Sequence, residues 1–105
     1  MSRQVNASDP RQVKERVDRE TLDREQELND IRALMHDEWG RRMMWRLLEM
    51  AGVYRSSFDA SNNRICFNEG RRDVGLHLLA DVDEACPEAM VLMSKEAKLR
   101  ETKNA

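Results

Sequence analysis

The sequence predicts an all-α protein, a small bundle of three or four helices preceded by a charged N-terminal helical arm. Of its 105 residues, 36% are charged and only 5% are aromatic, which is typical of helices with solvated faces rather than of a β-rich core. Apolar residues recur at spacings of three and four, the period of an α-helix. The sequence lacks the alternating apolar runs between turn signals that would indicate strands. Its length allows one small domain.

The N-terminal arm is predicted over residues 1–27. Residues 1–8 are polar and are expected to be mobile. Asp9 and Pro10 form a typical helix start, an N-cap followed by a proline at the first helical position. Because the arm has too few apolar residues for a core face, we expect either a solvated helix or a segment that orders only on a partner. Opposite charges four residues apart stabilise such a helix by about 0.2–0.5 kcal/mol a pair. The pairs are Lys14–Asp18, Glu15–Arg19, Arg16–Glu20, Arg19–Asp23 and Glu20–Arg24.

The helical domain is predicted over residues 28–100, and its first part contains two helices. Asp37 is a candidate N-cap for the second of them, so we expect a break between residues 36 and 40, where Gly40 also lies. Gly52 is a favourable residue just past a helix end, which places the end of the second helix near Ala51. The apolar residues of the two helices, with Trp39 and Trp45 as large anchors, are Leu28, Ile31, Leu34, Met35, Met43, Met44, Leu47, Leu48 and Ala51.

A central helix is predicted from about residue 64 to about residue 84, after a loop over residues 53–63. Tyr54 and Phe58 are expected to hold this loop against the core. Glycine inside a helix costs about 1 kcal/mol relative to alanine. Because Gly70 lies on the broad apolar stripe of the helix, we interpret it as the point where another helix crosses closely. The structural residues of this helix are predicted to be Phe67, Gly70, Val74, Gly75 and Leu78.

Pro87 is predicted to begin the last helix. Its basic residues gather near its C-terminal end, which suits the helix dipole, and residues 101–105 are expected to fray. The inward-facing residues are predicted to be Met90, Val91, Met93 and Ala97.

No combination of residues predicts catalysis, a metal site or a cofactor. The spacing Gly70-x-x-x-x-Gly75 is followed by Leu76-His77, whereas a phosphate-binding P-loop needs lysine and then serine or threonine there. Cys66 and Cys86 lack a metal-binding spacing, and Cys66 is expected to be a buried free thiol. Neither a membrane-length apolar run nor a signal peptide is evident, so we expect no membrane partner and a cytoplasmic site of synthesis.

The arginines are the most informative polar residues. The formal net charge is −2, yet residues 39–72 hold 7 basic and 3 acidic side chains, a local charge of +4. The guanidinium fork suits carboxylates and phosphates. Such a set fits an acidic protein surface, nucleic acid, or ion pairs within or between subunits. The predicted binding residues are Arg41, Arg42, Arg46, Arg71 and Arg72.

Three blocks of the sequence resemble a small family encoded among the virion genes of short-tailed bacteriophages and first noted in a Bordetella phage. The blocks are Gly40-Arg41-Arg42, then Leu47-Leu48-Glu49-Met50-Ala51-Gly52-Val53 with Phe58, then Phe67-Asn68-Glu69-Gly70-Arg71-Arg72-Asp73-Val74-Gly75-Leu76. The resemblance extends over about residues 39–93, and the last block is its most specific part. It implies a small helical phage protein associated with particle assembly, with no enzymatic activity. It marks Gly70-Arg71-Arg72 as a signature without assigning it a role.

Together these observations predict a non-enzymatic bacteriophage structural or assembly protein, a minor or internal virion component. It would reside in the virion or the host cytoplasm and dock to a head, portal or internal virion protein. A core of this size yields only about 3–5 kcal/mol, so docking or homo-oligomerisation would add stability. The alternative function is a nucleic-acid-binding accessory protein acting in packaging or regulation.

Overall fold

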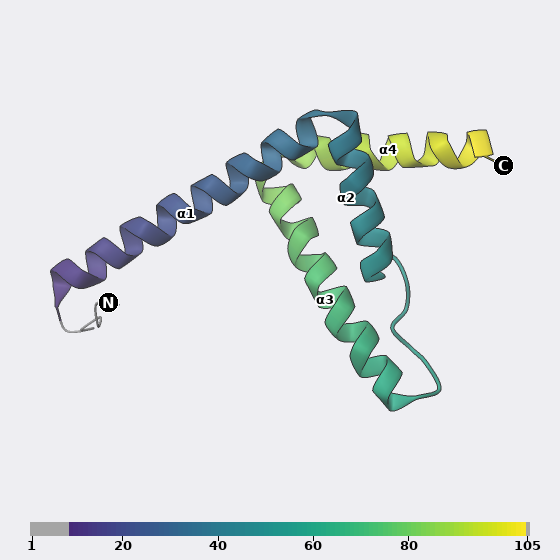
Figure 1. Cartoon of the computed structure of the whole chain (residues 1–105), viewed down its shortest axis with the longest axis horizontal. Coiled ribbons are helices and arrows are strands. Elements are labelled where there is room, and N and C mark those ends of the chain that lie inside the picture. Colours follow the sequence, from purple (N-terminus) through teal and green to yellow (C-terminus); the bar gives the residue numbers. More distant parts are fainter. Residues whose placement is uncertain (1–8, 105) are drawn as a thin grey trace.

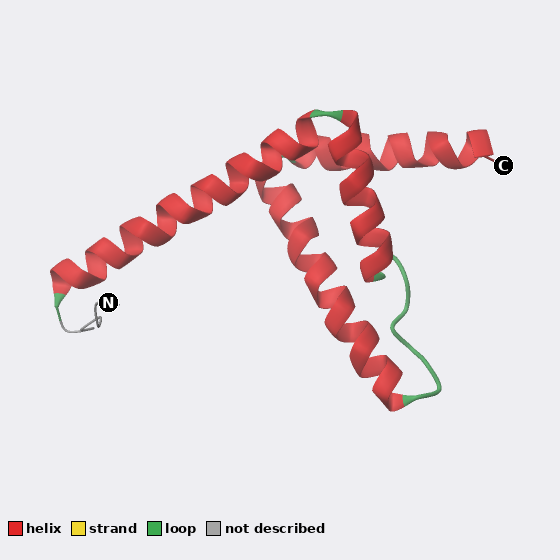
Figure 2. Cartoon of the chain, in the orientation of Figure 1, coloured by secondary structure: helices red, strands yellow, loops and turns green. Residues whose placement is uncertain are grey.

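The computed structural model describes residues 9–104 and consists of four α-helices over that range (Figure 1). The helices are α1 (Pro10–His36), α2 (Glu38–Ala51), α3 (Asn62–Ala85) and α4 (Pro87–Asn104). Within residues 9–104 no strand occurs (Figure 2), so the predicted all-α fold is confirmed. The mobility expected for residues 1–8 concerns a segment outside the described residues.

Helix α1 starts as the sequence predicts and continues without a break past residue 27. The backbone N–H of Arg11 donates to a carboxylate oxygen of Asp9 at 3.0 Å, and Pro10 occupies the first turn. Among the predicted ion pairs, Arg16 and Glu20 lie 3.8 Å apart. The 27 residues of α1 extend about 40 Å, and the N-terminal half projects from the body of the molecule (Figure 1).

The break between α1 and α2 falls at Asp37, which confirms the predicted position. Asp37 is the N-cap residue of α2, but its side chain forms no capping hydrogen bond; its carboxylate lies 3.4 Å from the ring of His36 instead. Gly40 is buried against the end of α1, where a Cβ would lie 1.7 Å from the carbonyl oxygen of Leu34. The tight connection therefore requires glycine at this position.

The core receives side chains from all four helices and from the residue after Gly52. Methionine supplies three of the most deeply buried side chains, in keeping with its ability to fill irregular gaps. The buried cluster consists of Met35, Met44, Leu48, Val53, Val82, Ala85, Cys86 and Met93.

The end of α2 is fixed by Gly52 and packs against α3 at Gly75. Gly52 adopts a left-handed conformation (φ 76°), and the N–H of Val53 donates to the carbonyl oxygen of Leu48 at 3.2 Å, as in a Schellman cap. A Cβ at Gly75 would lie 2.5 Å from Val53 Cγ2 and 2.6 Å from Ala51 Cβ. Gly75 is therefore the point where the two helices cross.

The prediction that Gly70 is a crossing point is wrong. A Cβ at Gly70 would meet nothing within 4 Å, and Phe67 and Val74 are 66% and 62% exposed. The apolar stripe continues into the core only through Leu78 and Val82. The reason is that α3 extends beyond the end of α2 while α1 diverges from it (Figure 1), so this side of the N-terminal half of α3 faces no described helix.

Three further predictions of burial are also wrong. Cys66 is exposed, and the buried thiol is Cys86, whose pKa is raised by burial. Phe58 is 82% exposed because the loop extends away from the core alongside α3 (Figure 1). Val91 is 57% exposed. Tyr54 stays over half exposed but does stack on Trp45.

The predicted starts of the last two helices are close to those observed. Helix α3 begins two residues earlier than expected, at Asn62, with the Ser61 side chain as its N-cap. Helix α4 begins at Pro87, and Met93 and Ala97 are buried as predicted. It continues through Asn104, four residues into the segment that was expected to fray.

We expect the Gly40→Ala substitution to destabilise the protein by at least about 3 kcal/mol, because the methyl group would overlap a backbone carbonyl that cannot move without separating α1 from α2. Urea denaturation followed by circular dichroism would measure the loss. A free energy of unfolding equal to that of the wild type would contradict this packing of the connection.

The two glycines of α3 form a matched pair with opposite expected outcomes. Gly70→Ala should stabilise the dilute protein by about 1 kcal/mol, since alanine is the better helix former and meets no neighbour. Gly75→Ala should destabilise it by about 1–2 kcal/mol, because overlap with Val53 and Ala51 outweighs the same helical gain. Denaturation midpoints that shift in the same direction would argue against the observed crossing.

Candidate interaction surface

Arg41 is an internal residue of the structure, at the junction of three helices. Its Nη1 donates to the carbonyl oxygens of Met35 at 2.9 Å and His36 at 2.8 Å, and its Nε donates to Glu96 of α4 at 2.5 Å. The Arg41 and Glu96 side chains are only 13% and 15% exposed. Arg41 therefore caps the C-terminal carbonyls of α1 and ties α4 to them, and it is not available to a partner.

Two arginines outside the predicted binding set, Arg24 and Arg32, join α1 to α3. Arg32 Nε donates to the carbonyl oxygen of Ala85, the last residue of α3, at 2.9 Å. Arg24 pairs with Glu84 at 2.5 Å and Asp81 at 2.9 Å. Hydrogen bonds to Glu84, Glu27 and Asp81 raise the pKa of the Arg24 guanidinium above its ordinary value. The spacing within α1 predicted Glu20 as the partner of Arg24. The two acidic residues one helical turn apart on α3, Asp81 and Glu84, are the sequence feature that could have indicated the observed partners.

Arg71 and Arg72 lie on α3, away from the start of α2. The Arg71 guanidinium stands over the ring of Phe67, 5.5 Å from its centroid, and would lie 3.7 Å from a Cβ at Gly52. Since Gly52 is eleven residues beyond Arg41, the two sites are separated by about 16 Å along α2. The five predicted binding arginines therefore do not form one surface.

Arg42 and Arg46 are the two predicted residues that the structure does bring together. With Arg100 of α4 they line a hollow of about 470 Å³ that also contains Trp39, Met43, Trp45 and Glu49. Arg42 is half exposed and lies 3.9 Å from Glu38. Three arginines against one glutamate give the lining a charge of +2. Tryptophan and arginine are the residues most enriched at binding hot spots.

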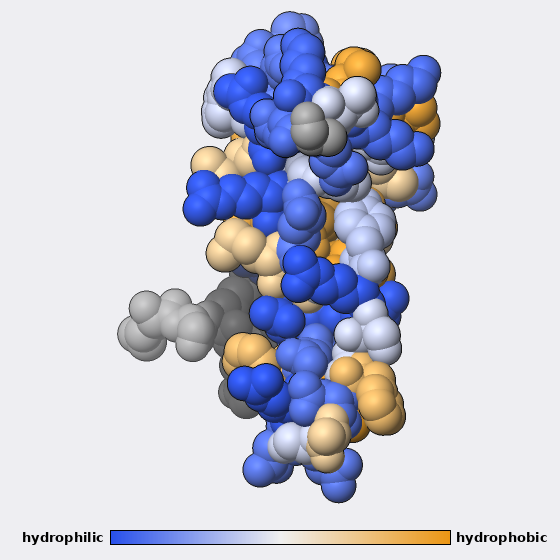
Figure 3. Space-filling model, turned by 90° about the vertical axis from the view of Figure 1, so that its right-hand side faces the viewer, coloured by the Kyte–Doolittle hydropathy of each residue, from blue (hydrophilic) through white to orange (hydrophobic). Residues whose placement is uncertain are grey.

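An apolar stripe runs along the outside of α2 next to this hollow. We call it the α2 outer stripe, and its members are Trp39, Met43, Leu47 and Met50, with exposed fractions of 56%, 47%, 39% and 59%. Their spacings of four, four and three place them on one side of the helix. Met44 and Leu48 are buried on another side of α2. The helix therefore has two apolar sides, whereas a surface helix normally has one. Seen from the α4 end, hydrophobic patches lie between hydrophilic side chains (Figure 3).

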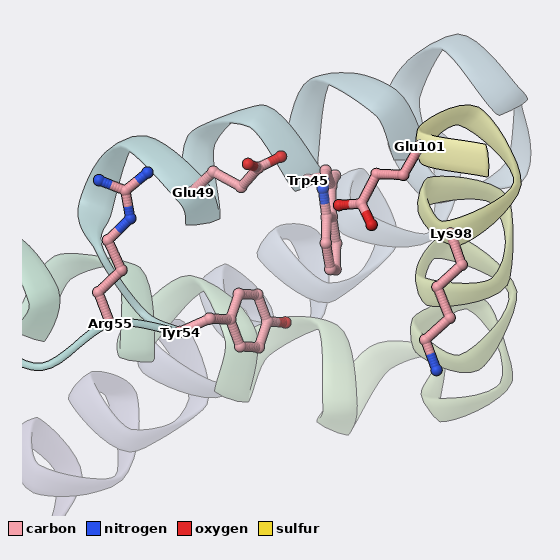
Figure 4. Close-up of a pocket in the computed structure, with 6 residues that line it drawn as sticks. All are labelled: Trp45, Glu49, Tyr54, Arg55, Lys98 and Glu101. Atoms are coloured by element: carbon pink, nitrogen blue, oxygen red, sulfur yellow. The ribbon is translucent and has the colours of Figure 1, made fainter. Parts of the chain in front are cut away.

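A second hollow, of about 340 Å³, lies where α2, the following loop and α4 approach one another (Figure 4). The rings of Trp45 and Tyr54 stack with centroids 5.2 Å apart, and desolvation raises the pKa of Tyr54. The charged residues of the lining are Glu49, Arg55, Lys98 and Glu101, which balance one another. Trp45 and Glu49 line both hollows and so stand between them.

Both histidines lie near exposed carboxylates. His77 and Asp73 lie 3.7 Å apart, but their side chains are 79% and 73% exposed, so no enclosed site surrounds them. Within residues 9–104 no group of three histidine, cysteine or acidic side chains is placed to hold a metal ion. No helix in that range is long and apolar enough to cross a membrane.

Comparison with known families identifies the chain. Residues 31–95 match the model of the Bbp19-like phage protein family. The chain belongs to this family. The matched region begins in the second half of α1 and ends in α4, so it contains the α1–α2 junction, the α2 outer stripe and the Gly75 crossing. The family assignment shows that this Bbp19-like chain is a bacteriophage protein and confirms the resemblance seen over residues 39–93. Neither a curated protein nor a solved structure matches the chain.

We expect Arg41→Ala to cost about 3 kcal/mol, because it leaves Glu96 and two helix-end carbonyls without their partner in a nearly buried site. Arg42→Ala is the matched control, and its exposed side chain should contribute less than about 0.5 kcal/mol. Combining Arg41→Ala with Glu96→Ala should cost less than the sum of the single changes. Additive losses in denaturation experiments would show that the two residues do not interact.

Proposed function

We propose that the protein is a non-enzymatic structural or assembly component of a bacteriophage particle, and that it docks to another virion protein through the α2 outer stripe and the adjacent arginines. Its place of action is the virion or, during assembly, the host cytoplasm. The observation that carries the proposal is the pairing of an uncovered apolar helix face with Arg42 and Arg46 in a phage protein.

The composition of this surface supports a protein partner. Single exposed apolar side chains are normal on protein surfaces, whereas contiguous ones mark interaction sites. Tryptophan, methionine and arginine are enriched in interface cores relative to other surfaces. The α2 outer stripe combines Trp39 and two methionines and is bordered by Arg42 and Arg46. A fitting partner therefore offers an apolar groove or helix face with carboxylates at its edge, which the arginine forks bind in pairs.

Nucleic-acid binding in packaging or regulation is the alternative, and the lining of the basic hollow is the observation that favours it. Three arginines around two tryptophans offer both phosphate contacts and stacking surfaces. The net charge of −2 and the use of Arg41 inside the fold weigh against it. A salt-sensitive mobility shift with duplex DNA at about 50 mM salt would favour this alternative, since electrostatic affinity is strongest at low salt.

Mass spectrometry of purified particles and assembly intermediates, in the phage that encodes the chain, tests the proposal. We expect the wild-type protein in one or both, and we expect the double change Trp39→Ala with Met43→Ala to reduce its incorporation at least about tenfold, because the change removes two central anchors of the docking surface. The matched control is Leu99→Ala, which removes an equally exposed apolar side chain from α4. Absence of the wild-type protein from particles and intermediates alike would refute the proposed role.

A further inference from the structure

Two apolar stripes remain uncovered where α1 and α3 separate. The helices meet at the ion pair between Arg24 and Asp81 and diverge from there toward their N-terminal ends (Figure 1). The free stripe of α3 consists of Phe67, Gly70 and Val74, and that of α1 of Val13 and Val17. Phe67, Val74 and Val17 are 66%, 62% and 48% exposed, and Val13 is half buried.

Each free stripe continues the strip through which α1 and α3 contact one another. Eighteen residues make five full helical turns, so Phe67 lies in line with Ala85, whose carbonyl accepts from Arg32 of α1. By the same count Val13 lies in line with Ile31, which packs against the core. The two stripes therefore face the space between the diverging helices, and within one chain they move apart instead of meeting.

The free stripes have matching positions along their helices. Val17 lies seven residues before Arg24 on α1, and Val74 lies seven residues before Asp81 on α3, which is about 10 Å along each helix from the ion pair. Val13 and Gly70 are each eleven residues, about 16 Å, from it. If α1 of a second copy crosses α3 at Gly70, Val17 of that copy comes to lie over Gly70. A twofold axis repeats the contact, so Val17 of each copy covers Gly70 of the other.

We infer that the protein forms a twofold dimer in which the N-terminal half of α1 in each copy packs across α3 of the other at Gly70. Gly70 has no neighbour within 4 Å in the single chain, so its cost in helix stability is not offset there. A branched valine can pack directly over a glycine of a helix, as Val53 does over Gly75 within the chain. Phe67 beside it supplies the large apolar group that such an interface needs.

The size of the uncovered surface agrees with a dimer. The radius of gyration is 18.6 Å, whereas a compact domain of this length has about 13 Å. The accessible surface is 8263 Å², compared with about 6,100 Å² for a compact monomer of 12.3 kDa. The extended shape thus leaves about 2,000 Å² more surface open to solvent than a compact monomer would, and the twofold contact would cover part of it.

Sedimentation equilibrium of the full chain over a wide concentration range tests the inference. We expect a dimer for the wild type, and at least about tenfold weaker association for Phe67→Glu and for Val17→Glu, because each places a charge in the contact. Leu99→Glu is the matched control on α4, with an equally exposed side chain, and should associate like the wild type. Met43→Glu, on the α2 outer stripe, should do the same, which separates dimerisation from docking to a virion protein.

A mixing experiment identifies the two surfaces in contact. In an equal mixture of Val17→Glu and Phe67→Glu, one of the two contacts joins two unaltered stripes, so the mixture should associate more tightly than either variant alone. Gly70→Ala should weaken the dimer although its added methyl group meets nothing in the single chain. A wild type that stays monomeric, a Val17→Glu variant that dimerises normally, or a dimer lost in Met43→Glu would each overturn the inference.

Discussion

The contact of Arg41 with the end of α1 is the interaction on which the arrangement of the helices depends. A single residue, Asp37, separates α1 from α2. The connection is therefore too short to supply hydrogen-bond donors to the last carbonyls of α1. Arg41, in the first turn of α2, reaches back to two of these carbonyls and forward to Glu96 of α4. The contact fixes the direction in which α2 leaves α1. It thereby decides which side of α2 is buried and which side carries the exposed stripe.

The ends of the helices follow one physical rule with two solutions. The carbonyls of a last helical turn need donors, which come either from a backbone that turns into the left-handed conformation or from side chains elsewhere. Helix α2 is followed by Gly52, which supplies the first solution. Helices α1 and α3 are followed by Asp37 and Cys86, neither of which adopts that conformation, and both receive arginine donors. Because those arginines belong to other elements of the fold, capping a helix end also joins two helices.

This rule explains which features could be predicted from the sequence. The cap at Asp9, the break near Asp37, the end at Gly52 and the start at Pro87 depend on residues within one turn, and the structure confirms them. Arg41 and Arg42 are chemically identical neighbours, and only a rotation of about 100° around the helix makes one an internal clamp and the other an exposed residue. The opposite environments of Gly70 and Gly75 arise from position along α3: Gly75 lies beside the end of α2, whereas Gly70 lies where α3 extends beyond it. An apolar stripe predicts a helix, but it does not say whether the neighbour that covers the stripe belongs to the same chain.

The apolar surface that no described part of the chain covers has an energetic consequence. The described residues bury nine hydrophobic side chains and expose fourteen large ones, and a core of this size contributes only about 3–5 kcal/mol of net stability. Most of the apolar surface of such a protein can therefore stabilise it only through association. A bound partner raises the free energy of unfolding as its concentration rises above the dissociation constant. The long projecting helix and the double apolar character of α2, both unfavourable in an isolated monomer, are then the features that the proposed docking and dimerisation would stabilise.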